Sequence, residues 1–524
     1  MKKNVFSGAL VLAAASVAAK IIGAIYRIPL TNVLGAEGMG MYQLVFPVYA
    51  LFITLSVSGF PVALSRIVAE ERIRGKSGEG YFKLTMMLLC CFSVVSAAII
   101  AAFSPKISAL QGNSEVSYGY LIIAPALIFV GMISAFRGYF QGCLNMIPTA
   151  VSNLIEQVIK LALGLTLAIV LKHRGIMQSL YGALFGVTVS EFGAFIYLFI
   201  TYLVKRKTYG GGEFLRDAST KRLTSVAFPI ALVSIMLPLS QFIDSFLIIN
   251  LLRGTGMSLG EATAQYGLLS GPVGSLINMP IVIMLSLSIA IVPAVAAGKE
   301  ERDLEGILKK SALSVKISYL IGLPCALFII IFSYPIFRLL YPALPLGESA
   351  LASTMLTISS ISIIAYSVMQ IYTSLMQALG KTYIPVISLT VGIVIKIILT
   401  ASLTNVIGIF APAVGNVALG VTAAVINRIY FSALVGKKFQ LVKNISMILL
   451  SSVIMMLAAF MIKELKYNEI WALVVGAAVS VVLYFTLVLT LNTLSDEETK
   501  SLPFSNALLK IKRTLRFWDR AEEK

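Results

Sequence analysis

The stretch QGCLNMIPTAVSNLIEQVIKLALGL, residues 141–165, has a counterpart later in the chain, QALGKTYIPVISLTVGIVIKIILTA, residues 377–401. Each copy has a Gln, a small residue, an Ile-Pro pair and one lysine, Lys160 or Lys396, within an apolar run. In both copies a short polar segment leads through Ile-Pro into a helix, so both helices should cross a membrane in the same direction. This pattern predicts a parallel repeat of six helices per half.

Apolar runs of this kind recur along all 524 residues. The chain is 58% hydrophobic and 13% charged, with a mean hydropathy of +0.91, whereas soluble proteins have about 45–50% apolar and about 25% charged residues. The sequence therefore predicts an all-α integral membrane protein with about fourteen transmembrane helices. The expected spans are 5–26, 41–64, 84–103, 119–141, 150–171, 180–204, 224–250, 266–295, 311–333, 350–375, 384–406, 409–435, 443–463 and 470–492.

Most lysines and arginines fall in alternate connections between these spans. This distribution predicts that both termini lie in the cytoplasm, and we expect the protein in the plasma membrane. The segment Lys172-His173-Arg174 is the one basic outer loop. The first 20 residues also resemble a signal peptide, but removing them would reverse the alternation. We expect an N-lobe of helices 1–6 (residues 1–220), a C-lobe of helices 7–12 (221–436), two further helices (437–494) and a basic cytoplasmic tail (495–524). In the tail, apolar residues at helical spacing predict either a helix on the anionic inner leaflet or a solvated one; they are Leu508, Ile511, Leu515 and Trp518.

Several chemistries are excluded by the composition. Four cysteines lie in or beside apolar runs and His173 is the single histidine, so no metal site, disulfide framework or cofactor is expected. The net charge of +18 does not indicate nucleic acid, because no soluble basic module is present. Gly380-Lys381-Thr382 lacks the earlier glycine of a nucleotide-binding loop, and no bound nucleotide is expected.

Charged residues inside the predicted spans are candidates for function, since each costs at least about 2.5 kcal/mol to place in a bilayer centre. The cations outnumber the carboxylates: they are Lys20, Arg27, Arg137, Lys160, Lys316, Lys396 and Arg428, against Glu156, Glu191 and Asp244. Arg137, Lys316 and Arg428 lie near inner helix ends, where their side chains can reach the headgroups.

Lys160 and Lys396 lie near the middle of their helices and at matching places in the repeat, so we expect both to face a central chamber. Lys20 and Arg27 share one face of the first helix and could line the same chamber. A surplus of positive charge there would attract an anion. Glu156 lies four residues before Lys160, so a purely structural ion pair is the competing interpretation.

Proline adds a mechanical signal. Pro229 and Pro238 lie in the seventh span and Pro280 in the eighth, and each frees a backbone carbonyl and permits a bend. We predict the gating hinge in these two helices. Proline is also frequent in membrane helices that have no hinge, which is the alternative interpretation.

The residues from Ala18 to Glu71 and from Tyr266 to Gly298, together with the second repeat, resemble a known family. They are similar to the polysaccharide-transport and MurJ-like branches of the multidrug/oligosaccharidyl-lipid/polysaccharide exporter superfamily, especially the stage V sporulation protein B group. The resemblance implies a flippase that moves an undecaprenyl-diphosphate-linked saccharide, such as lipid II or a spore-cortex precursor, by alternating access. It also implies that Lys20 and Arg27 line the cavity, whereas a further cavity arginine of the family falls near Ser275 and is missing here.

Two other functions remain as alternatives. A cation or drug antiporter on the same architecture would need carboxylates to dominate the cavity. A membrane-embedded glycosyl transferase or ligase would need an acidic or histidine site on long outer loops, so we expect no enzyme. Glu156, Glu191 and Asp244 could couple transport to an ion, or the membrane potential could act on the charged groups. We expect a monomer whose partners are a lipid-linked saccharide and membrane lipids.

Overall fold

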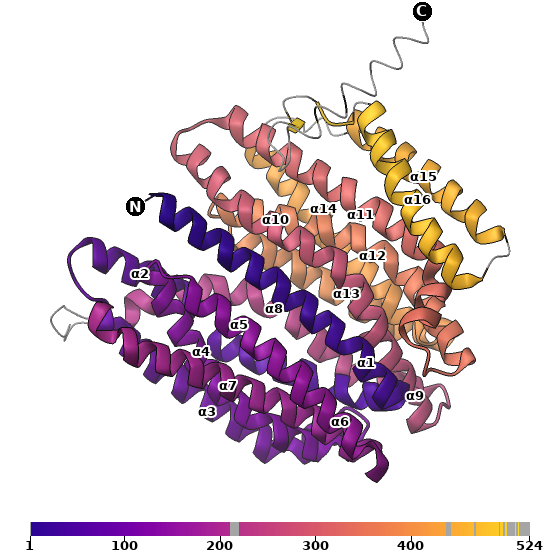
Figure 1. Ribbon diagram of the computed structural model, residues 1–524, viewed down its shortest axis with the longest axis horizontal. Coiled ribbons are helices and arrows are strands. Elements are labelled where there is room, and N and C mark those ends of the chain that lie inside the picture. Colours follow the sequence, from indigo (N-terminus) through magenta and orange to yellow (C-terminus); the bar gives the residue numbers. More distant parts are fainter. Residues whose placement is uncertain are drawn as a thin grey trace, which may run out of the picture. The chain divides into compact units, whose positions relative to one another are not determined.

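The computed structural model describes residues 2–209, 219–435, 442–465, 468–491, 493–495, 498–499, 509 and 512. Within these residues the chain is helical throughout (Figure 1), and every predicted span falls on one or more helices. The helices of the first half are α1 (Lys2–Val57), α2 (Phe60–Ile73), α3 (Glu79–Leu110), α4 (Ser117–Gly142), α5 (Ile147–Ile159), α6 (Leu165–Leu171) and α7 (Ile176–Tyr209). Those that follow are α8 (Thr220–Gly254), α9 (Leu259–Leu268), α10 (Gly274–Glu300), α11 (Leu304–Leu340), α12 (Leu346–Ala378), α13 (Tyr383–Ile407), α14 (Phe410–Val435), α15 (Val442–Glu464) and α16 (Glu469–Thr490).

Short irregular turns interrupt or join some of these helices. A π-helical turn, Lys160–Gly164, joins α5 to α6, and a second, Leu269–Val273, joins α9 to α10. Single 3-10 turns, Ser114–Val116 and Lys172–Arg174, precede α4 and follow α6. The fifth and eighth predicted spans are therefore composite helices, with a widened turn near the middle of the fifth and near the start of the eighth.

Thirteen helical stretches in the described part of the chain are long and apolar enough to cross a membrane. The first, Ala14–Ile73, has 60 residues, whereas one crossing needs about 20. It is interrupted inside α1 at Gly35, whose φ of 68° lies in a region that glycine adopts without a steric penalty. Two predicted spans therefore form one nearly continuous helical run, and the chain is a multi-pass membrane protein.

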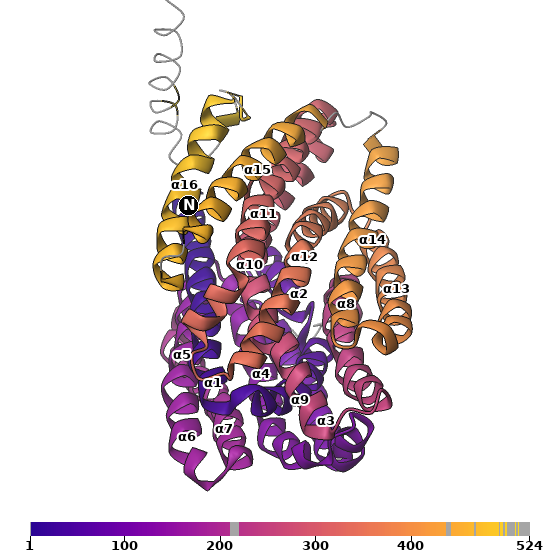
Figure 2. The ribbon, with the colours of Figure 1, turned by 90° about the vertical axis from the view of Figure 1, so that its right-hand side faces the viewer.

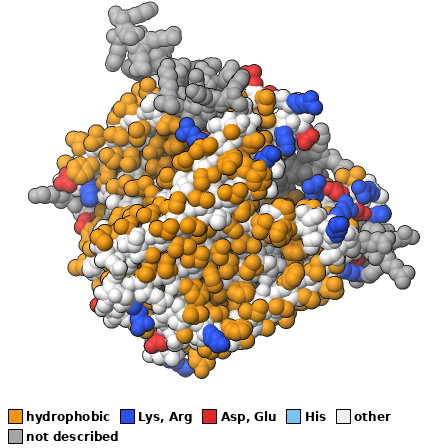
Figure 3. All heavy atoms as spheres, turned by 180° about the vertical axis from the view of Figure 1, so that it is seen from behind, with side chains coloured by type: hydrophobic (Ala, Val, Ile, Leu, Met, Phe, Trp, Pro, Cys, Tyr) orange, Lys and Arg blue, Asp and Glu red, His pale blue; other side chains and the backbone are white. Residues whose placement is uncertain are grey.

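Its outer surface fits that environment. Figure 3 shows one face covered mostly by hydrophobic side chains, with charged side chains gathered mainly toward the margins. Large apolar residues such as Phe185, Ile200 and Val482 are exposed. In a bilayer this apolar surface contacts lipid chains, so its exposure does not carry the free-energy cost that it would have in water.

The chain divides into two compact units. The first comprises Met1–Ser275, Ala343–Glu348 and Pro385–Gly415, and the second comprises Leu276–Pro342, Ser349–Ile384 and Asn416–Lys524. The division into lobes at residues 220 and 436 remains a prediction. The predicted tail helix lies outside the described residues, apart from Leu509 and Lys512.

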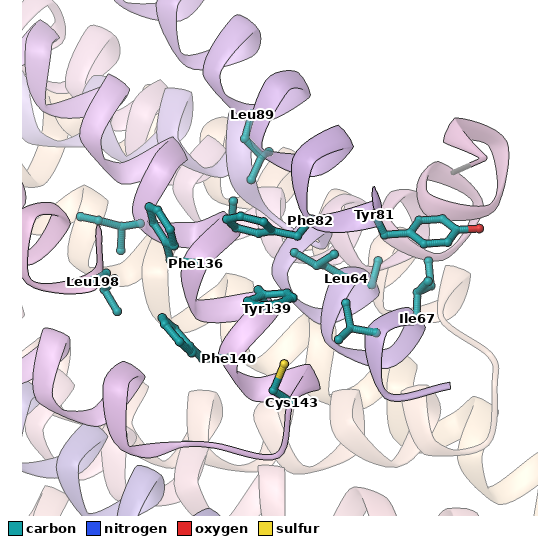
Figure 4. Packing of buried hydrophobic residues seen from close by; sticks show 14 of the residues in the cluster. Leu64, Ile67, Tyr81, Phe82, Leu89, Phe136, Tyr139, Phe140, Cys143 and Leu198 are labelled. Carbon is teal, nitrogen blue, oxygen red and sulfur yellow. The ribbon is translucent and has the colours of Figure 1, made fainter. Parts of the chain in front are cut away.

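Aromatic packing holds the first unit together near α3, α4 and α7. The ring of Phe82 lies 4.7 Å from that of Tyr139 and 5.0 Å from that of Tyr202, measured between centroids. Phe136 and Leu198 belong to the same buried cluster (Figure 4). Each aromatic pair contributes roughly 0.5–1.5 kcal/mol beyond simple burial, so these helices form a rigid frame for the polar residues described next.

Candidate substrate site

Arg27 is held in place by two groups of the first unit. Its Nη1 donates a hydrogen bond to Ser275 Oγ at 3.2 Å, and its guanidinium carbon lies 5.9 Å from the centroid of the Phe46 ring. Ser275 in turn donates to the carbonyl oxygen of Gly271 at 2.7 Å. Ser275, near which the resemblance places the missing cavity arginine, is therefore a partner of Arg27. No carboxylate in the described residues pairs with Arg27, so its charge is available to an anion.

Lys160 lies over the ring of Tyr26, the residue that precedes Arg27. It opens the π-helical turn Lys160–Gly164, and its Nζ lies 5.9 Å from the centroid of the Tyr26 ring. Arg27, Glu156 and Glu191 all act electrostatically on it. Such widened turns are frequent at functional sites because they displace one residue from the regular helical pattern. Two of the four predicted substrate-binding cations thus come together in the first unit.

Glu156 has a partner other than the predicted one. Its Oε2 accepts a hydrogen bond from Arg137 Nη2 at 3.1 Å, and its Oε1 accepts from Gln157 at 2.8 Å. Arg137 also donates to Ser152 Oγ at 3.0 Å. An ion pair between Glu156 and Lys160 is not formed among the described residues, although the two charges still interact. Arg137 of α4 therefore has both of its partners on α5.

Glu191 on α7 is buried, and its carboxylate makes no hydrogen bond within the described part of the chain. The charges that act on it are those of Glu156, Arg137 and Lys160. The hydroxyl of Tyr49 is also buried without a partner there, and it interacts with the carboxylates of Glu191 and Glu156. In this cluster the cations Arg27, Arg137 and Lys160 face two carboxylates, which leaves an excess of positive charge.

Lys396 belongs to a different group of residues. Its Nζ donates to Asp244 Oδ2 at 2.5 Å and to Ser240 Oγ at 2.9 Å, and the side chain is only 3% exposed. Ser240 and Asp244 lie one turn apart on α8, so they share the face of that helix that meets α13. The charge of Lys396 is therefore balanced by Asp244 of α8, since the helix α13 contains no carboxylate of its own.

Among the described residues, Lys20 has no hydrogen-bonded partner and the predicted hinge prolines do not interrupt their helices. Lys20 is exposed on α1, with no hydrogen-bonded partner in the described residues. Pro229 and Pro238 lie inside α8, which stays helical through both, and Pro280 lies inside α10. The irregular turn of the eighth span is at Pro272 instead. The hinge remains a prediction.

Lys316 and Arg428 differ in their surroundings. Lys316 is buried on α11, and its Nζ donates to Glu498 Oε2 at 2.7 Å, while Arg428 is exposed. Burial alone would raise the pKa of the Glu498 carboxyl, but hydrogen bonds from Lys316 and from the backbone N–H of Ser495 hold the pKa below its usual value. Lys316 therefore has a structural partner, Glu498, in the segment that follows α16.

Sequence reasoning missed the residues that surround the charges. They are aromatic residues of α1: Tyr26 precedes Arg27 in the chain, the ring of Phe46 faces the Arg27 guanidinium, and Tyr49 interacts with Glu191. Their aromatic spacing is a usable signal, since Phe46 stacks on Tyr42 at 5.3 Å and meets Tyr49 at 5.8 Å between ring centroids. Arginine beside an aromatic face is suited to bind phosphate through its free N–H groups.

Comparison with known proteins identifies the family. Residues 5–299 match the family described as polysaccharide biosynthesis protein, and residues 229–402 match the MatE family. Stage V sporulation protein B of Bacillus subtilis (strain 168) is 25% identical, with 97% of this chain and 99% of that protein covered. Lipid II flippase MurJ of the same organism is 25% identical over 80% of this chain and 81% of that protein.

A solved structure has the same fold. The inward closed conformation of lipid II flippase MurJ superimposes with a TM-score of 0.69 at 16% identity, covering 91% of this chain and 98% of that one. The first family match covers more than half of the sequence. Its members are transporters, which confirms that the chain is not an enzyme. This chain belongs to the polysaccharide biosynthesis protein family, within the multidrug/oligosaccharidyl-lipid/polysaccharide exporter superfamily of membrane transporters.

Proposed function

We propose that this protein is a flippase that moves an undecaprenyl-diphosphate-linked saccharide from the inner to the outer leaflet by alternating access. The observation that carries the proposal is that Lys160 lies over the ring of Tyr26, the residue before Arg27, so that the two cations act on each other within membrane-spanning helices of the first unit. The names of two relatives, a lipid II flippase and a stage V sporulation protein, support a cargo such as lipid II or a spore-cortex precursor.

Electrostatics explains why the cargo would be a phosphorylated lipid. Charges inside a bilayer are costly, so a cluster in which three cations meet two carboxylates is retained where the remaining positive charge gains from binding an anion. In a low-dielectric wall the Coulomb attraction is several times its value in water. A diphosphate offers two anionic groups to Arg27 and Lys160, while its isoprenoid tail can stay among the lipid chains.

The transport cycle would use the two predicted lobes, residues 1–220 and 221–436, with bending at Pro229, Pro238 or Pro280. Two energy sources fit the residues. The membrane potential supplies about 2.3 kcal/mol per charge per 100 mV, and Glu156, Glu191 or Asp244 could couple transport to an ion. We place the protein in the plasma membrane as a monomer with both termini in the cytoplasm.

The second candidate is a MATE-like cation or drug antiporter. The match of residues 229–402 to the MatE family favours it, and the buried carboxylate of Glu191 is the group that it would use. The excess of cations around Arg27 argues against a cationic cargo. Uptake of a cationic dye into vesicles that contain the purified protein would distinguish the antiporter from the flippase.

The decisive experiment replaces single cations in cells that depend on this protein for flipping. Arg27→Ala and Lys160→Ala should each reduce the outer-leaflet accessibility of labelled lipid-linked saccharide at least about tenfold, because each removes a ligand of the diphosphate. Lys172→Ala, on an exposed lysine at the end of the same composite helix as Lys160, is the matched control. Normal accessibility in both test variants, with wild-type protein levels, would reject the site.

A further inference from the structure

Helix α11 contains two prolines, Pro324 and Pro335. A proline has no N–H, so each leaves the carbonyl four residues earlier without its helical partner. The two carbonyls are those of Leu320 and Ile331. Because eleven residues make about three helical turns, both lie on the same side of α11. In a membrane such carbonyls need other donors.

Helices α15 and α16 supply a donor to each carbonyl. Lys463 Nζ, near the end of α15, donates to the Ile331 carbonyl oxygen at 2.9 Å. The Tyr484 hydroxyl of α16 donates to the Leu320 carbonyl oxygen at 2.7 Å. Both bonds lie within the second unit and join segments more than 130 positions apart. The same pair of helices thus satisfies both groups that the prolines leave unbonded.

The bend of α11 is next to the Lys463 contact. Phe332 has non-helical backbone angles, φ −100° and ψ 15°, and its side chain is fully buried. A Cβ added to Gly476 of α16 would lie 2.4 Å from the Phe332 ring, so only glycine allows this approach. Ala459, Ala472 and the neighbouring apolar residues complete the packing. Figures 1 and 2 both show α15 and α16 beside α11.

We propose that α15 and α16 form a brace that fixes the bend of α11, with Lys463 and Tyr484 as positioning residues. The ammonium group of Lys463 replaces the N–H that Pro335 lacks, and the Tyr484 hydroxyl replaces that of Pro324. The two helices beyond the predicted twelve-helix repeat therefore control the conformation of one transport helix. Since Lys463 lies near the helix end, its bond is the one that can open while the Phe332 packing stays in place.

Hydrogen exchange measured by mass spectrometry on the full-length protein in lipid nanodiscs tests the brace. Lys463→Met should make the amides of residues 328–340 exchange roughly tenfold faster, because a charge-assisted bond no longer holds the bend. Lys463→Arg should exchange as the wild type, because it keeps a donor. Lys172→Met is the control for loss of a lysine charge outside the second unit.

A proline replacement separates the brace from general destabilisation. In Pro335→Ala the restored N–H can bond to Ile331, so adding Lys463→Met should cause no further increase. Tyr484→Phe with and without Pro324→Ala is an independent second cycle, read on residues 316–328. The proposal is overturned if Lys463→Met leaves exchange at the wild-type rate, or if its effect is equally large in the Pro335→Ala background. Because the readout is backbone exchange, the result does not depend on the proposed cargo.

Discussion

At the scale of single residues, the pair of Lys396 and Asp244 shows how a charge in the membrane can be structural. Lys396 lies on α13 and Asp244 on α8, both in the first unit, and Lys396 donates a second hydrogen bond to Ser240. Gly415 of α14 packs closely against Lys396, since a Cβ on Gly415 would lie only 3.1 Å from Lys396 Cγ. We therefore expect Lys396 to contribute more to stability than to substrate binding.

Lys396→Met leaves Asp244 buried without a counter-charge, and Asp244→Asn does the reverse. Each single variant should lose roughly 3–5 kcal/mol of stability, whereas the double variant, which removes both charges, should recover most of it. Thermal unfolding of the detergent-solubilised protein, followed by the loss of monodisperse protein, measures the difference. Equal stability of all four proteins would mean that the pair is not a stabilising contact.

Both members of this pair could be selected from the sequence, because a charge in an apolar run is conspicuous. Their pairing could not, since it depends on how α8 and α13 are rotated relative to each other. The same holds for Glu156, whose nearest cation along the helix is Lys160 but whose partner is Arg137 on α4. Charged residues are predictable from composition, whereas their partners are set by tertiary packing.

At the scale of helices, the crossing of α1 and α9 depends on glycine. A Cβ on Gly267 would lie 2.2 Å from the Ala36 carbonyl oxygen, and one on Gly40 would lie 2.0 Å from the Thr263 carbonyl oxygen. The two backbones therefore touch, as small residues allow in membrane helices. The hydrogen bond from Gln43 Nε2 to the Ser270 carbonyl oxygen, at 2.8 Å, joins the same two segments of the chain.

Gly267→Ala should lower the stability of the protein by roughly 1–3 kcal/mol, because backbone atoms must separate to admit the methyl group. Gly347→Ala is the matched control, since a Cβ there meets nothing within 4 Å and alanine is the better helix former. The measurement is again thermal unfolding in detergent. A Gly267→Ala protein as stable as the control would contradict the tight crossing.

At the scale of the whole molecule, the count of membrane crossings depends on α1 and α2. The sequence predicts two crossings within residues 5–64, and the structure has one helical run that is broken at Gly35 and again at Gly59. Hydropathy could not reveal that continuity, because residues 27–40 include Asn32, Glu37 and three glycines and are typical of a loop between two spans. The distribution of lysine and arginine predicts that the run crosses twice.

Cysteine labelling can decide the crossing count. In a chain whose native cysteines are replaced by serine, a membrane-impermeant maleimide should label Glu37→Cys and Lys172→Cys in intact cells, because both exposed side chains are predicted to face outward. Lys76→Cys, which is exposed in the segment after α2, should react only after permeabilisation. Labelling of Lys76→Cys but not of Glu37→Cys in intact cells would show that the topology is the reverse of the predicted one. The same labelling of both variants in intact cells would mean that the 60 residues of Ala14–Ile73 do not cross twice. The orientation also bears on transport. If the lysine and arginine distribution predicts it correctly, Arg27 and Lys160 would first meet the diphosphate from the cytoplasmic side.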